Sequence, residues 1–163
     1  MQPAITGSGV FTPADVISNE ELVEAFNAYA ERFNAAHADA IAAGDVEAKG
    51  LSSPEFIHNA SGIERRHVMD KSGVLDPEVM HPHLRQRSDD EPGIMAEMAL
   101  DACGKALAQA GRAGAEIDLI ICAASNHERP YPAIAIEIQE LLGAGGFAFD
   151  MNVACSSATF GIQ

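Results

Sequence analysis

One stretch near the end of the chain decides the fold, and residues 147–161 spell it as Phe-Ala-Phe-Asp-Met-Asn-Val-Ala-Cys-Ser-Ser-Ala-Thr-Phe-Gly. Its apolar first half is typical of a buried strand, and the small residues after Cys155 are compatible with a helix. A thiol at the first turn of a helix faces unpaired backbone N–H groups and the positive end of the helix dipole, which favour the thiolate. The stretch therefore predicts a cysteine nucleophile of the kind used in acyl transfer.

The segments before this stretch predict an α/β order. Ile117–Ala123 is a continuous apolar run, as expected of a strand buried on both faces of a sheet. Helical spacing predicts helices over Pro92–Ala110 and Pro132–Leu142, and the latter leads into a strand over Phe147–Val153. The alternation indicates right-handed crossovers and a mainly parallel sheet.

The first half of the chain carries clear start and stop signals. Ser18 and Glu21 form a capping box that opens a helix, which we expect to continue to about Ala43 and to end at Gly44. The other elements predicted in this half are a first strand over Ala4–Phe11, a short helix or turn over Phe56–Gly62, a strand over Ile63–Met69 and a loop over Lys71–Glu91.

Composition narrows the class of protein. The 163 residues include 47% hydrophobic and 21% charged residues, which indicates a globular chain. The net charge of −14 argues against nucleic acid as a partner and against an acidic carrier protein, unless a local basic patch compensates. Neither a membrane span nor a secretory signal is expected, so a cytoplasmic protein is the default prediction.

The cysteines and histidines predict no metal centre. Cys103, Cys122 and Cys155 show no CxxC spacing, so we expect reduced thiols rather than disulfides or a zinc site. Cys122 in mid-strand and Cys103 in mid-helix are expected to be buried structural thiols. His81 and His83 flank a proline but lack a third ligand.

Four ordered motifs resemble one enzyme family. They are Ile5–Pro13, Ser61–His67, the segment from Pro130 to Gly143, and the nucleophile region Phe149–Gly161. Together they resemble β-ketoacyl-acyl-carrier-protein synthase III, a member of the thiolase superfamily. The resemblance covers nearly the whole chain, except two expected insertions at about 28–53 and 71–91.

The resemblance implies a fold and an extent. It implies a thiolase-like α/β fold of α-β-α-β-α layers, of which residues 1–163 would be the N-terminal half with a mostly parallel, mixed five-stranded sheet. The C-terminal half would lie beyond Gln163, together with a His and an Asn that complete the site. Intact members of this family are homodimers.

The resemblance also implies a mechanism without a permanent cofactor or metal. Cys155 would take an acyl group from acyl-CoA and pass it to the carbanion formed by decarboxylation of malonyl-acyl-carrier protein. Phe56, Arg65 and Arg66 would bind CoA, and Tyr131 would reach the acyl pocket of the partner subunit. Phe56 can still stack on the adenine, whereas Ala60 stands where the family often has an Arg, so Arg85 and Arg87 are further candidates for CoA binding.

Several other functions are also compatible with the sequence. The chain could belong to a thiolase-fold acyltransferase of a secondary pathway, or to a non-catalytic partner subunit of a heterodimeric synthase, although such subunits usually lack the cysteine. A cysteine protease is disfavoured because its local signatures are missing. Gly7-Ser8-Gly9 follows a predicted strand, but no third glycine opens a helix, so a dinucleotide-binding motif is also disfavoured.

Overall fold

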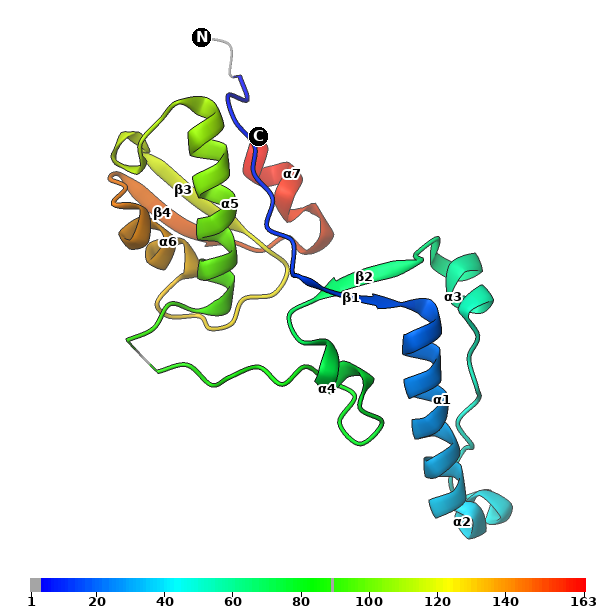
Figure 1. Cartoon of the computed structure of the whole chain (residues 1–163). Helices are drawn as coiled ribbons and strands as arrows, with labels where there is room; N and C mark the ends of the chain where they lie inside the picture. Colours follow the sequence, from blue (N-terminus) through cyan, green and yellow to red (C-terminus); the bar gives the residue numbers. More distant parts are fainter. Residues whose placement is uncertain (1–3, 89) are drawn as a thin grey trace. The chain divides into compact units, whose positions relative to one another are not determined.

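The computed structural model describes residues 4–88 and 90–163 and divides into two compact units. Unit 1 runs from the N-terminus to Phe11 and from Arg87 to Gln163, and unit 2 is Thr12–Gln86. Figure 1 shows the helices and strands of each. Their order is β1 Asp15–Ser18, α1 Asn19–Ala36, α2 Ala38–Ala43, α3 Pro54–Ser61, β2 Arg65–Val68, α4 Lys71–Leu75, α5 Ile94–Ala110, β3 Leu119–Ala123, α6 Ile134–Leu142, β4 Phe147–Met151 and α7 Ser157–Ile162, with short 3-10 turns at Gly114–Glu116 and Ala154–Ser156.

Unit 1 is built around the parallel pair β3 and β4. The register places Ile120 opposite Ala148 and Cys122 opposite Asp150. Because side chains alternate along a strand, these four residues share one face of the pair. That face packs against α5 and α6 around a core of Ala96, Ile120, Ile134, Ala135 and Ile138.

The opposite face of the pair carries α7. A Cβ placed on Gly161 would lie 3.0 Å from the Cβ of Ala123, so this helix approaches β3 closely. Unit 1 is therefore layered as helices, sheet and helix (Figure 1). The predicted strands over Ile117–Ala123 and Phe147–Val153 and the predicted helices over Pro92–Ala110 and Pro132–Leu142 are confirmed to within two residues at each end.

The predicted first strand over Ala4–Phe11 is wrong, because this segment is extended but pairs with no strand in the described residues. It lies along α5 instead. A Cβ on Gly7 would lie 2.2 Å from the carbonyl oxygen of Ala106, and a Cβ on Gly9 would lie 2.0 Å from that of Ala102. The two glycines thus permit the backbone to contact the helix directly, which explains the Gly-Ser-Gly sequence that no nucleotide motif accounts for.

Unit 2 combines the antiparallel pair β1 and β2 with α1–α4. The predicted capping box is present, since Ser18 Oγ accepts a hydrogen bond from Glu21 N and the Glu21 carboxylate accepts one from Ser18 N. The expected helix continues to Ala43 with one break at His37, whose Nδ1 lies 2.8 Å from the carbonyl oxygen of Phe33. Gly44 ends it in the left-handed conformation, as predicted. The predicted loop over 71–91 contains the short helix α4, which Asp70 caps.

An extended segment, residues 47–53 and called the strap below, runs antiparallel to α1. Asn27 Oδ1 and Nδ2 bond both backbone groups of Ser52, at 2.9 and 3.1 Å, and Asn34 does the same with Lys49, at 2.8 and 2.9 Å. Seven helical residues rise about 10.5 Å, and three extended residues span about 10 Å. The distance from Asn27 to Asn34 along the helix therefore matches the distance from Ser52 to Lys49 along the strap, so both pairs of hydrogen bonds can form together.

Candidate active site

Cys155 lies at the junction between β4 and α7, in the 3-10 turn Ala154–Ser156. Its side chain is exposed, whereas Cys103 and Cys122 are half-buried. The residue before it, Ala154, has a φ of 51°, a left-handed conformation that costs about 1–2 kcal/mol for a residue with a Cβ. The sequence prediction of a thiol at a strand-to-helix junction is confirmed as to position.

Hydrogen bonds fix this turn. Asn152 Oδ1 accepts from Ala154 N at 3.1 Å, and the buried hydroxyl of Ser157 accepts from Val153 N at 3.0 Å and donates to Ala154 O at 2.8 Å. Asn152 Nδ2 donates to Ser125 O, which joins the turn to the loop after β3. Because both sides of the turn are held, the strained Ala154 persists and fixes the backbone at Cys155.

Asp150 connects β4 to the first turn of α6. Its Oδ2 accepts from Ile134 N at 2.9 Å and its Oδ1 accepts from Ala135 N at 2.8 Å. A carboxylate at this place satisfies unpaired N–H groups and interacts favourably with the helix dipole. The sequence motifs did not predict this role of Asp150, although a charged side chain inside an apolar strand is a signal for it.

The two half-buried thiols are poor nucleophiles. Burial raises the pKa of Cys122 to about 11, and the nearby Asp150 carboxylate and Cys103 add to the effect. Burial also raises the pKa of Cys103. Since thiolates rather than thiols attack carbonyl carbons, Cys155 is the better candidate for acyl transfer.

Tyr131 lies in the loop between β3 and α6, and its side chain is 87% exposed. It borders a hollow of about 390 Å³ together with Arg129, Pro132, Glu137 and Leu141. An ion pair of 2.6 Å joins Arg129 to Glu137, and Gly93 N donates to Glu137, so this loop is bonded to α6 and to the start of α5.

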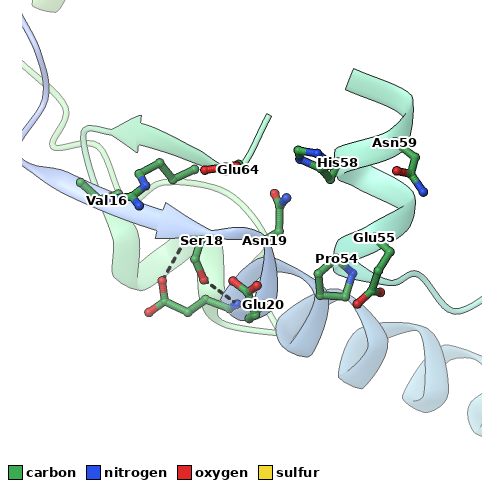
Figure 2. Close-up of a pocket in the computed structure, with 11 residues that line it drawn as sticks. Val16, Ser18, Asn19, Glu20, Pro54, Glu55, His58, Asn59 and Glu64 are labelled. Atoms are coloured by element: carbon green, nitrogen blue, oxygen red, sulfur yellow. Dashed lines mark hydrogen bonds between the residues drawn. The ribbon is translucent and has the colours of Figure 1, made fainter. Parts of the chain in front are cut away.

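The predicted CoA-binding residues Phe56, Arg65 and Arg66 lie in unit 2. Phe56 is exposed on α3, and Arg65 borders a hollow of about 700 Å³. Figure 2 shows other residues that line this hollow, among them Glu20, Glu55 and Glu64. Arg66 is half-buried, and its Nη2 donates to Asn19 Oδ1 at 2.9 Å. Cys155 lies in unit 1, so these residues and the nucleophile belong to different units.

The hollow beside Arg65 is acidic. Glu20, Glu21, Glu55 and Glu64 line it, with His58 and Arg65 as its basic groups. Hydrogen bonds from backbone N–H and Ser18 lower the pKa of Glu20, and Lys71 with the Ser18 N–H lowers that of Glu21, so both stay ionised near neutral pH. Four carboxylates disfavour a phosphate group at this place.

Arg87 is also engaged within the protein. It pairs with Glu97 on α5, and its Nη1 donates to Pro92 O at 2.6 Å. His83 contacts Asp70, whose carboxylate accepts four hydrogen bonds, from Ser72 N, Ser72 Oγ, Gly73 N and His83 N. These contacts give Arg87 and His83 structural roles.

Comparison with known proteins places these features in context. The chain is 55% identical, over 141 residues, to a β-ketodecanoyl-[acyl-carrier-protein] synthase from Pseudomonas aeruginosa, which covers 86% of the chain and 40% of that protein. It is 31% identical to a β-ketoacyl-[acyl-carrier-protein] synthase III from Bordetella petrii, over 98% of the chain and 37% of that protein. The chain thus spans about two fifths of the length of these curated relatives. No family model matches it.

Solved structures agree on the fold. The 3-oxoacyl-[acyl-carrier-protein] synthase III from Aquifex aeolicus superposes with a TM-score of 0.64 at 24% identity, over 96% of the chain and 36% of that structure. OleA from Xanthomonas campestris superposes with a TM-score of 0.66 at 18% identity, over 98% and 37%.

The layered α/β fold and the cysteine after a parallel strand define the class as thiolase-like, as the sequence predicted. The expected five-stranded sheet is not observed, because the described residues form two separate two-stranded sheets, one antiparallel and one parallel. Within that class the chain belongs to the β-ketoacyl-[acyl-carrier-protein] synthase III family and fits an N-terminal part of its members. Among the described residues, no helix is both long and apolar enough to cross a membrane.

Proposed function

We propose that this chain supplies the nucleophile of a condensing enzyme, which joins an acyl group from acyl-CoA to malonyl-acyl-carrier protein. One observation carries the proposal, namely the exposed Cys155 in a turn that hydrogen bonds hold between a parallel strand and a helix. The names of the relatives support it, because they are β-ketoacyl-[acyl-carrier-protein] synthases.

The proposed reaction has two halves. The Cys155 thiolate attacks the thioester carbonyl of acyl-CoA, the bond to the CoA sulfur breaks, and CoA leaves with a proton. Malonyl-acyl-carrier protein then loses CO₂, its carbanion attacks the acyl carbon, and the Cys155 thiolate is released with the 3-oxoacyl product. The backbone N–H of Cys155 is our candidate for one oxyanion donor.

The name of the Pseudomonas aeruginosa relative favours a medium-length primer. A β-ketodecanoyl product has a ten-carbon acyl group, and condensation with malonate contributes two of those carbons. We therefore propose an eight-carbon acyl-CoA as the primer. Phe56, Arg65 and Arg66 remain our candidates for CoA contacts and Tyr131 for the acyl pocket. Arg66 already donates to Asn19, and four carboxylates line the hollow beside Arg65, so both arginines have competing contacts within the chain.

The test uses the protein at its full natural length and radiolabelled acyl-CoAs of two, four, eight and twelve carbons. We expect covalent label on the wild type that is strongest with eight carbons, is absent from Cys155→Ala and is unchanged in Cys103→Ser. Label that persists in Cys155→Ala would show that another residue is the nucleophile.

A second step of the same test separates the alternatives. Addition of malonyl-acyl-carrier protein should convert the labelled enzyme to a 3-oxoacyl product. Label that transfers to another acceptor without this product would favour a thiolase-fold acyltransferase, and an unlabelled wild type would favour a non-catalytic partner subunit. The expected homodimer in the cytoplasm belongs to the same proposal, and light scattering of the purified protein tests the dimer.

A further inference from the structure

A second group of reactive side chains lies in unit 1, apart from Cys155. Cys122 and Asp150 are paired residues in the register of β3 and β4, and His127 follows in the loop after β3. The Cys122 sulfur, a ring nitrogen of His127 and a carboxylate oxygen of Asp150 all lie within 4.8 Å of one another. Within residues 4–88 and 90–163, this is the one group of at least three His, Cys, Asp or Glu side chains close enough together to hold a metal ion.

His127 gives independent evidence for a ligand. Its side chain is 15% exposed, and its Nε2 is buried without a hydrogen-bond partner in the described structure. That atom lies 4.0 Å from Asp150 Oδ2, too far for a hydrogen bond. A buried polar atom without a partner is unfavourable, and an ion between the ring and the carboxylate would supply that partner.

Asp150 is already oriented as a metal ligand would need to be. Its two oxygens accept backbone N–H groups of Ile134 and Ala135, which fixes the plane of the carboxylate. Each carboxylate oxygen has a further lone pair for a metal ion. Hydrogen bonds of this kind orient ligands in metal sites and make them more effective.

We propose that Cys122 Sγ, His127 Nε2 and an Asp150 oxygen form a binding site for a zinc-like divalent cation. Thiolate, imidazole and carboxylate are the donors that Zn²⁺ takes in proteins, at about 2.0–2.3 Å. A tetrahedral ion with those bond lengths places its donors about 3.3–3.7 Å apart, so the side chains must approach by roughly 1 Å. Three protein donors leave one coordination position open.

Binding exchanges a proton for the ion. The Cys122 thiol is protonated at neutral pH, because burial, Asp150 and Cys103 raise its pKa to about 11. The S–H bond therefore breaks as the sulfur–metal bond forms, and one proton is released to solvent. The bound ion would hold the loop after β3, which also carries Tyr131, against the ends of both strands.

Cobalt(II) tests the site because thiolate ligation gives it a charge-transfer band and tetrahedral coordination gives strong visible bands. The full-length protein, freed of metal with a chelator, is titrated with CoCl₂ alone, and then with ZnCl₂ to displace the cobalt. We expect one cobalt per chain with both signals, and loss of both on addition of zinc. Absence of the bands, or bands that persist in both Cys122→Ser and His127→Asn, would overturn the proposal.

Matched variants locate the site. Cys103→Ser alters the other half-buried thiol of the same core and should keep the bands, and Cys155→Ala should keep them too. Circular dichroism checks the fold of each variant. If Cys122→Ser does not fold, His127→Asn decides, because loss of even an outer-shell partner lowers metal affinity about ten- to a hundredfold. An affinity of His127→Asn equal to that of the wild type, or bands lost in Cys155→Ala, would refute the assignment.

Discussion

Replacement of Asp150 offers the most direct test of how the nucleophile strand is joined to the rest of unit 1. Its carboxylate accepts two N–H groups from the first turn of α6, at 2.8 and 2.9 Å, and is 17% exposed. A hydrogen bond to a charged group contributes about 1.5–3 kcal/mol, so we expect Asp150→Ala to destabilise this connection by about 3–5 kcal/mol. Asp150→Asn keeps one acceptor oxygen and should cost about 2 kcal/mol.

Hydrogen–deuterium exchange of the peptide that covers α6 measures this change locally. A loss of about 3–5 kcal/mol corresponds to about a 100- to 4000-fold fall in protection, at about 1.4 kcal/mol per factor of ten. Asp118→Ala is the control, because Asp118 is exposed and its carboxylate has no hydrogen bond or ion pair in the described part of the chain. Protection of α6 within about tenfold of the wild type in Asp150→Ala would refute the reasoning.

Three further outcomes follow from the same structure. Folding raises the pKa of Cys122 from 9.0 to about 11, so the unfolded chain releases this proton at lower pH than the folded chain. The free energy of unfolding should therefore fall as pH rises from about 9 to 11. Urea midpoints measured over this range should fall less in Cys122→Ser than in the wild type, and equal falls would contradict the assignment. Gly9→Ala places a Cβ 2.0 Å from Ala102 O and should lower the melting temperature of unit 1. Gly104→Ala on α5 is the control, because nothing lies within 4 Å of its Cβ, and it should be neutral or stabilising by up to about 1 kcal/mol. Similar melting temperatures for the two variants would exclude the contact between Gly9 and α5. Asn34→Ala removes both hydrogen bonds to Lys49, so the free energy of protection against amide exchange in the strap should fall by about 1–2 kcal/mol. Asn59→Ala is the control, because Asn59 is exposed on α3 and its replacement should leave this protection unchanged. Unchanged exchange at Lys49 in Asn34→Ala would count against the side-chain pairing.

Local signals predicted most of the elements. The capping box at Ser18 and Glu21 and the glycines after α2, α5 and α6 mark helix ends because they satisfy terminal backbone groups on their own. The strand over Ala4–Phe11 could not be judged this way. Its alternation of small and apolar residues is compatible with a paired strand and also with an extended segment that contacts α5. Which of the two forms depends on contacts with the carbonyl groups of Ala102 and Ala106, which are distant in sequence.

In the candidate site too, the sequence predicted what depends on neighbouring residues and not what depends on residues distant in sequence. The position of Cys155 follows from a strand and a helix that are adjacent in sequence, so the residues around it were sufficient to predict it. The group of Cys122, His127 and Asp150 has no motif spacing, because a strand register brings two of its members together and a loop brings the third. The availability of the arginines was also beyond sequence reasoning, since it depends on partners such as Asn19 and Glu97.

The paired hydrogen bonds of Asn27 and Asn34 have a consequence for where the chain tolerates added residues. The strap is held to α1 at Lys49 and at Ser52, so an extra residue between these two would displace one pair of bonds from its partner. Glu47 and Ala48, which lie between the turn after α2 and the first of these bonds, are under no such constraint of length. A peptide tag or a reporter sequence inserted after the exposed Glu47 should therefore leave α1 and the strap aligned, which makes this position the natural one for labelling the protein.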